Sequence, residues 1–218
     1  MQLFKKIDSM ESGGDKSNKA DLIIEAAQKW FGLYGIEKTS MREIADDLKL
    51  SKASLYYYFP DKESLYVAVI EKEQNEFLSL VSESITKGAD PEEILRKYSV
   101  KRLSYFRTLL NLSRLRLDTY SDLKPVIKET RKAFREKEKE ILLKIFRMGM
   151  KRGVFHIDDP DKSASLFLDI LKGLRILVVN DKNTMIIEQE EYDTLLENTV
   201  EFTEVFIKAL KTKNLKKY

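Results

Sequence analysis

Apolar residues recur at helical spacing along the chain. Between residues 18 and 34, Leu22, Ala26 and Trp30 mark one face of a first helix, and Gly35 is a glycine typical of a helix end. The same spacing predicts further helices beginning at Ser40, Ser51 and Asp61, and others at residues 91–111, 113–121, 124–152, 160–181 and 189–212. Four prolines, eight glycines and no repeated strand-turn-strand pattern place the chain in the all-α class.

Residues 39–65 contain two short helices joined by a tight turn. Ser40 and Glu43 form a capping box at the start of the first short helix, and Ala45 is small where a neighbouring helix must come close. Lys49 and Leu50 make the turn, with Leu50 expected to be its buried residue. Ser51 caps the next helix, which ends near Tyr58 before a Phe-Pro pair. This order of features predicts a helix-turn-helix.

The second short helix carries chemistry suited to DNA. Small residues at its start allow the backbone to approach base edges, and Lys52 can donate to guanine or to a phosphate. Tyr56 and Tyr57 can pack their rings while their hydroxyls reach phosphates. The alternative is that the tyrosines are core or rim aromatics and that Lys52 and Lys62 are merely solvated. For any single residue both interpretations stay open, whereas the ordered set favours DNA.

Charge and composition limit the classes of function that the chain can have. The net charge is +3, and residues 39–62 carry four positive and four negative charges, so DNA binding would depend on charge placement rather than bulk basicity. With no cysteine and only His156, thiolate and multi-histidine sites are excluded, and we expect no catalytic residue, metal or cofactor. The absence of a long apolar run or secretory segment predicts a cytoplasmic protein that does not enter membranes.

The stretch from Ile23 to Leu65 resembles the N-terminal domain of the TetR family of bacterial transcriptional regulators. The resemblance is carried by AAQKWFGLYGIEKTSMREIADDLKLSKASLYYYFPDKESL. Two positions depart from the family pattern, because Lys49 stands where glycine is frequent and Tyr58 where histidine is frequent. Residues 1–17 are polar and contain glycine, so we expect a flexible tail there. The resemblance implies a helix-turn-helix DNA-binding head (18–65) and a larger helical body for ligand binding and dimerisation (66–218).

The resemblance also implies which residues meet DNA. Phosphate contacts are expected from Thr39, Ser40, Lys52, Tyr56, Tyr57, Tyr58 and Lys62. Arg42, Lys52, Ala53 and Ser54 are expected near bases. Arg42 has an equally plausible alternative, an intrahelical ion pair with Asp46 four residues later.

The body is expected to join two chains and to hold a ligand. Apolar stripes on helices 160–181 and 189–212 predict a four-helix bundle between two chains, which would hold two heads about 34–36 Å apart. The expected interface residues are Phe167, Leu171, Leu174, Val178, Phe202 and Phe206. The alternative is that both stripes face only the chain's own core.

A ligand cavity is implied by the resemblance, and the residues that could line it are Tyr98, Arg102, Tyr105, Phe106, Tyr120, Phe134 and Phe146. Aromatics at this spacing also fit a plain core, and the arginines of this region also fit a solvated face. The function hypothesis is a homodimeric repressor released from a palindromic DNA operator by an unidentified small-molecule effector. The alternative is a helical adaptor that binds protein and has no DNA role.

Overall fold

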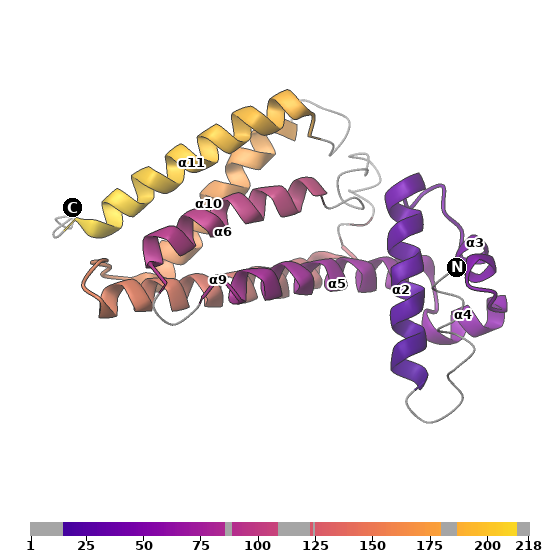
Figure 1. The fold of residues 1–218 in the computed structure, drawn as a ribbon. Helices are drawn as coiled ribbons and strands as arrows, with labels where there is room; N and C mark the ends of the chain where they lie inside the picture. The colour runs from indigo at the N-terminus through magenta and orange to yellow at the C-terminus, as the bar shows by residue number, and fades with distance from the viewer. Residues whose placement is uncertain (1–14, 86–88, 109–122, 124, 180–186, 213–218) are drawn as a thin grey trace. The chain divides into compact units, whose positions relative to one another are not determined.

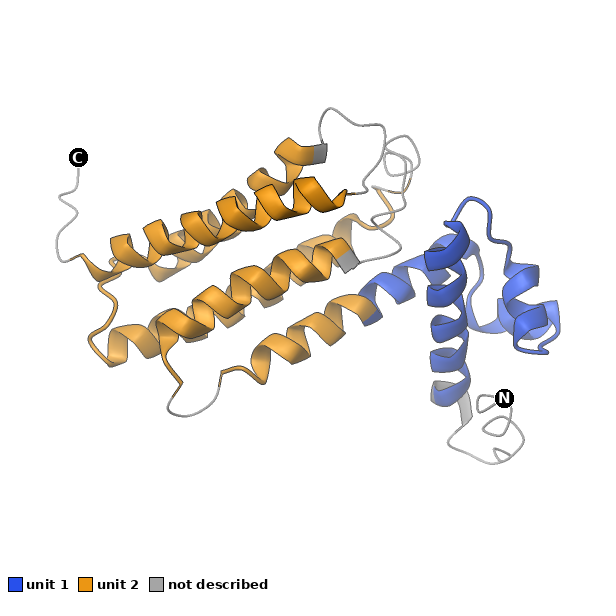
Figure 2. Ribbon diagram, turned by 45° about the horizontal axis from the view of Figure 1, so that its top comes forward, with its two compact units in different colours: residues 1–72 blue, residues 73–218 orange. Residues whose placement is uncertain are grey.

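The computed structural model describes residues 15–85, 89–108, 123, 125–179 and 187–212, and every regular element in these ranges is a helix (Figure 1). The predicted all-α class is therefore confirmed. The chain divides into two compact units, Met1–Lys72 and Glu73–Tyr218 (Figure 2). The division falls inside one long helix, α5 (Lys62–Ser82), seven residues beyond the boundary expected from the sequence.

The first unit, called the head, contains α2 (Asp15–Tyr34), α3 (Met41–Asp47), α4 (Lys52–Tyr58) and the start of α5. Helix α2 already includes residues 15–17, which the sequence assigned to a flexible tail. Gly35 ends this helix with a φ of 82°, and its N–H donates to the Phe31 carbonyl over 2.8 Å. The expected glycine stop is confirmed, because this backbone conformation carries a penalty for any residue with a Cβ.

The core of the head draws buried side chains from each of its helices. The described side chains of the head with no exposed surface are Ile23, Ala27, Phe31, Ile44, Leu55, Leu65, Tyr66 and Val69. The Phe31 and Tyr66 rings meet edge to face, with centroids 5.6 Å apart. Trp30 donates from Nε1 to the Asp47 carboxylate over 3.1 Å and so ties α2 to the end of α3. The short helices thus rest on a framework formed by α2 and α5.

The second unit, called the body, contains the rest of α5 with α6 (Pro91–Thr108), α9 (Lys128–Lys151), α10 (Pro160–Val179) and α11 (Gln189–Lys211). Helix α6 packs against α9 and α11, and α10 packs against the same two helices. The expected starts at Pro91 and Pro160 are confirmed. Each follows an aspartate, and the Asp90 and Asp159 carboxylates accept backbone N–H groups of the first turn. The helix expected at 113–121 lies outside the described residues.

Aromatic side chains and one buried ion pair hold the body together. Phe167 and Phe206 join α10 to α11 with centroids 4.7 Å apart. Arg102 of α6 donates from Nε to Glu138 of α9 over 2.6 Å, and both side chains are at most 9% exposed. Tyr98 donates its hydroxyl to the same carboxylate over 2.7 Å. Burial and the neighbouring Glu138 charge raise the pKa of this phenol well above its usual value, so it remains a donor.

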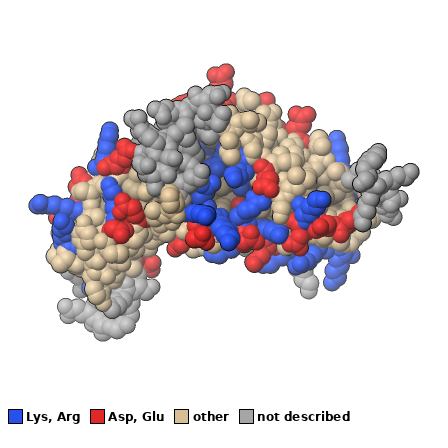
Figure 3. Space-filling view, turned by 180° about the vertical axis from the view of Figure 1, so that it is seen from behind, with Lys and Arg blue, Asp and Glu red and all other residues tan. Residues whose placement is uncertain are grey.

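The surface carries charges of both signs. Acidic and basic side chains are interspersed over the face seen in Figure 3, with lysines and arginines gathered near its middle. His156 is exposed, as expected, and its backbone N–H donates to the Leu210 carbonyl over 2.7 Å. Within the described ranges, each helix is too short or too polar to cross a lipid bilayer.

Candidate nucleic-acid interface

The N-terminus of α3 is fixed by the capping box that the sequence predicted. The Glu43 N–H donates to Ser40 Oγ over 3.2 Å, and the Ser40 N–H donates back to the Glu43 carboxylate over 2.8 Å. The Ser40 hydroxyl also donates to this carboxylate, over 2.7 Å. This side-chain hydrogen bond, followed by the backbone one, lowers the pKa of Glu43. The start of the helix-turn-helix is therefore held by local hydrogen bonds that need no distant partner.

The turn between α3 and α4 is made without glycine. Lys49 has a φ of 54°, in the left-handed region, and the Leu50 N–H donates to the Ala45 carbonyl over 2.8 Å. Leu50 itself is only half-buried, and Leu48, at 5% exposure, is the buried side chain of the turn. The prediction that Leu50 is the buried residue of the turn is therefore wrong.

Helix α4 presents most of its side chains to solvent. Ser51 caps it by accepting the Ser54 N–H over 3.1 Å, and Leu55 anchors it with no exposed surface. The predicted DNA residues on this helix are all at least partly accessible. Lys52, Ala53, Tyr56 and Tyr57 are exposed, whereas Ser54 and Tyr58 are half-buried. A helix held by one buried leucine and exposed on its other faces has the form needed to enter a major groove.

Two predicted phosphate-contacting residues occupy other roles in the structure. Thr39 is 1% exposed, and its hydroxyl donates to the Gly35 carbonyl over 2.9 Å. Lys62 is half-buried, and its Nζ donates to the Ile36 and Thr39 carbonyls over 2.8 and 3.2 Å. The prediction for the Thr39 side chain is corrected, because a buried hydroxyl already used by a carbonyl cannot reach a phosphate. Lys62 crosses from α5 to hold the loop that precedes α3.

Arg42 lies on the surface of α3 beside Asp46. Its Nε is 3.6 Å from the Asp46 carboxylate, and the two side chains are 80% and 68% exposed. The intrahelical pair considered as an alternative is therefore present. An ion pair this exposed contributes little stability and exchanges readily with other partners, so it does not prevent Arg42 from meeting a base.

An open hollow of about 440 Å³ lies between the loop before α3, the middle of α4 and the start of α5. Its lining includes four of the predicted DNA residues, Thr39, Ser40, Tyr56 and Lys62. Lys38 and Lys62 contribute positive charge, and Glu37, Asp61 and Glu63 contribute negative charge. The sequence patterns did not single out Lys38, Pro60 or Glu63, because only the folded loop brings them beside Tyr56.

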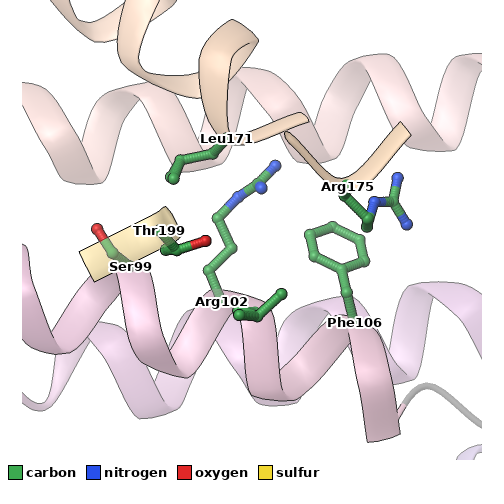
Figure 4. A pocket seen from close by; sticks show the side chains of 7 residues that line it. Ser99, Arg102, Phe106, Leu171, Arg175 and Thr199 are labelled. Carbon is green, nitrogen blue, oxygen red and sulfur yellow. The ribbon is translucent and has the colours of Figure 1, made fainter. Parts of the chain in front are cut away.

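The body holds a second, smaller cavity, with room for about one water molecule (Figure 4). Of the seven residues predicted to line a ligand site, Arg102 and Phe106 do so. Four others, Tyr98, Tyr105, Phe134 and Phe146, pack among neighbouring core side chains instead. Tyr120 lies outside the described residues. The lining residues missed from the sequence are Ser99, Leu103, Leu171, Arg175 and Thr199. No sequence pattern groups these five residues, because they come from three different helices.

The predicted dimer residues divide into two groups. Phe167, Leu171 and Phe206 are at most 9% exposed within their own chain, which is the burial that the core alternative predicts. Their place in a dimer interface stays a prediction. Leu174, Val178 and Phe202 are half-buried. The apolar side chains of α10 and α11 that do face solvent are Leu166, Ile176, Leu177, Val200 and Val205.

Comparison with known proteins agrees with this geometry. Residues 23–69 match the family model described as bacterial regulatory proteins of the tetR family. The structure of a transcriptional regulator from Cytophaga hutchinsonii is 39% identical and covers 89% of this chain and 99% of its own, with a TM-score of 0.80. The chain belongs to the TetR family of transcriptional regulators. It is all-helical and carries the family's DNA-binding helix-turn-helix.

Other relatives are more distant or match only part of the chain. A TetR-family regulator from Pectobacterium atrosepticum covers 93% of this chain and 99% of its own at 20% identity, with a TM-score of 0.72, and shares the fold. The HTH-type regulators YuxN of Bacillus subtilis and RutR of Escherichia coli are 38% and 31% identical over 36% and 45% of this chain. These two matches span only 27% and 46% of the relatives' own lengths.

Proposed function

We propose that this TetR-family protein is a homodimeric repressor that a small-molecule effector releases from a palindromic DNA operator. The observation that carries the proposal is the exposed face of α4, set on a capped helix-turn-helix and anchored only by Leu55. A regulator of this kind would act in the cytoplasm, where bacterial DNA lies.

The proposed DNA contacts follow from position and exposure. Arg42, Lys52, Ala53 and Ser54 would lie near bases, and Ser40, Tyr56, Tyr57 and Tyr58 would meet phosphates. The Lys52 ammonium lies 5.5 Å from the centroid of the Tyr56 ring, so the two side chains form one polar edge of α4. Thr39 and Lys62 would support these contacts by positioning the loop before α3.

The proposed dimer uses the apolar residues that α10 and α11 leave exposed. Leu166 and Leu177 of α10 are 51% and 73% exposed, and Val200 and Val205 of α11 are 43% and 59% exposed. Gly173 lies between the two leucines and has no atom within 4 Å of the place a Cβ would occupy. Pairing these surfaces from two chains would remove apolar area from water in a four-helix arrangement.

The effector is proposed to bind in the body, at the small cavity after it widens. The lining of this cavity joins α6, α10 and α11, and the last two carry the proposed interface. A ligand that prefers one arrangement of these helices, while DNA prefers another, would weaken DNA binding, and DNA would weaken ligand binding by the same factor.

Selection of bound sequences from random duplex DNA tests the proposal. We expect a palindrome whose half-sites lie about one helical turn apart, with affinity that falls steeply as salt rises. The Lys52→Ala/Tyr56→Phe double variant should lose this enrichment. Lys144→Ala, which removes one charge from an exposed position on α9, should retain it. Failure of the unaltered protein to enrich any sequence, with or without candidate effectors, would contradict the DNA-binding role.

A further inference from the structure

The two helices of the helix-turn-helix are too short to keep a fixed direction alone. Helices α3 and α4 contain seven residues each, and helices of this length depend on contacts with the rest of the protein. Helix α3 buries Met41, Ile44 and Ala45, whereas α4 buries only Leu55. Apolar contacts are non-directional, so they hold the helices close without fixing their angle. Polar contacts at the ends of α3 are therefore important for the direction of both helices.

Side chains of the two long helices of the head hold α3 at both of its ends. Before its N-terminus, Lys62 of α5 donates to the Ile36 and Thr39 carbonyls. At its last residue, Asp47 accepts a hydrogen bond of 3.1 Å from Nε1 of Trp30 on α2. A helix of seven residues is only about 10 Å long, so a hydrogen bond at each end restricts its tilt and its rotation.

The Trp30 indole is itself held in place by its neighbours. The ring is half-buried, and its centroid lies 5.0 Å from that of the Tyr34 ring, one turn further along α2. Helix α2 is joined to α5 by a hydrogen bond of 2.8 Å from Lys72 Nζ to Gln28 Oε1. Because packing already orders the indole, it loses little conformational freedom when it donates to the exposed Asp47 carboxylate.

The end of α3 that Trp30 holds leads directly into the turn before α4. Within this turn, the Leu50 N–H donates to the Ala45 carbonyl over 2.8 Å. Only three residues separate Asp47 from Ser51, which caps α4. A change in the position of Asp47 would therefore change the direction in which α4 presents its exposed side chains.

We propose that Trp30 and Asp47 are a pair of positioning residues, which set the angle of α3 and α4 for DNA without touching DNA themselves. The inference deepens the proposed function and rests on it for the operator that serves as the probe. It gives an acidic residue a favourable part in binding a polyanion. The charge of that residue alone would have the opposite effect.

The opposite signs of these two effects provide the first test, which is operator affinity measured by fluorescence anisotropy. Trp30→Phe keeps a ring beside Tyr34 but removes the N–H, and it should weaken operator binding by about ten-fold in a protein with two heads. Asp47→Ala should weaken binding to a similar extent, although it removes a negative charge. Asp47→Asn removes the same charge but keeps an acceptor, so it should bind at least as tightly as the unaltered protein. An Asp47→Ala protein that binds as tightly as Asp47→Asn would overturn the proposal.

The matched control is Glu25→Ala, which removes one negative charge from an exposed position on the same helix as Trp30. It should not weaken operator binding, and a loss equal to that of Asp47→Ala would contradict the specific role of the pair. The double variant Trp30→Phe/Asp47→Ala should bind about as weakly as either single variant, because both changes remove one hydrogen bond. Losses that multiply in the double variant would show that the two residues act independently. Thermal unfolding checks that each variant is folded at the temperature of the assay.

NMR measurements without DNA distinguish a failure of the pair from a failure of the proposed function. Trp30 is the only tryptophan of the chain, so its indole N–H gives a single resonance, which should shift in Asp47→Ala and stay in place in Glu25→Ala. Hydrogen exchange of the Leu50 N–H should be faster in Trp30→Phe, because the turn is less restrained. These changes in a protein that binds no operator would support the pair and contradict the proposed function. Unchanged Leu50 exchange in a protein that does bind the operator would contradict the pair and leave the repressor intact.

Discussion

Lys62 and Lys52 are both lysines of the head, but their ammonium groups are used differently. Lys62 donates to two backbone carbonyls, whereas Lys52 is exposed on α4. Lys62→Met should therefore lower the free energy of unfolding by about 2 kcal/mol, because two carbonyls lose a charged donor. Denaturant unfolding measures this change. Lys52→Met should leave stability nearly unchanged.

Loss of each lysine should also affect DNA binding in a different way. If Lys62 acts by positioning the loop, Lys62→Met weakens operator binding without changing its salt dependence. Lys52→Met should instead reduce the slope of log affinity against log salt by about one, as expected for a lost phosphate contact. An equal reduction in slope for Lys62→Met would show that this lysine also contacts DNA directly.

At the scale of the element, the stability of the N-terminus of α3 should depend on pH through the ionisation of Glu43. Hydrogen bonds from Ser40 hold the pKa of this carboxyl below its ordinary value of 4.5. Because the folded-state pKa is depressed, the stabilisation is complete above the ordinary value and is lost as pH falls through the lower one. An NMR titration of the Glu43 side chain should give a midpoint below 4.5, and Ser40→Ala should move that midpoint upward. A midpoint at 4.5 or higher in the unaltered protein would contradict the capping role.

The sequence predicted the start of a helix correctly where the hydrogen-bonding residues lie within a few positions of each other in the chain. Ser40 and Glu43 are three residues apart, and Asp159 accepts from Lys162, so both helix starts could be found by spacing alone. Lys62 meets Ile36 across 26 positions, and no local pattern records that contact. Helical periodicity also identifies an apolar face without saying what covers it. The spacing of Phe167 therefore fits both a dimer interface and the core of its own chain, and the structure buries its side chain completely within the chain.

At the scale of the whole molecule, the proposed dimer depends on exposed leucines. Leu177 is 73% exposed, so Leu177→Glu should not change the unfolding temperature of the separated chain. It should convert the dimer to a monomer in sedimentation equilibrium, because a charge would be buried unpaired at the interface. Operator affinity should fall by at least about 100-fold as the two heads lose their link.

The matched control for this variant is Leu80→Glu. Leu80 is a 57% exposed leucine on α5, away from α10 and α11 in sequence, and it is outside the proposed interface. Leu80→Glu should leave the molecular mass in sedimentation equilibrium and the operator affinity unchanged. A Leu177→Glu protein that remains dimeric would place the interface elsewhere on the body.

Gly173 gives the proposed interface an evolutionary consequence. A glycine inside a helix costs about 1 kcal/mol relative to alanine, and the open space around Gly173 would accept the extra methyl group in the single chain. Beneath a partner helix, the same methyl group would hold two backbones apart. In vitro selection for thermal stability would therefore favour alanine at position 173. Selection for gene regulation in the cell would favour glycine there.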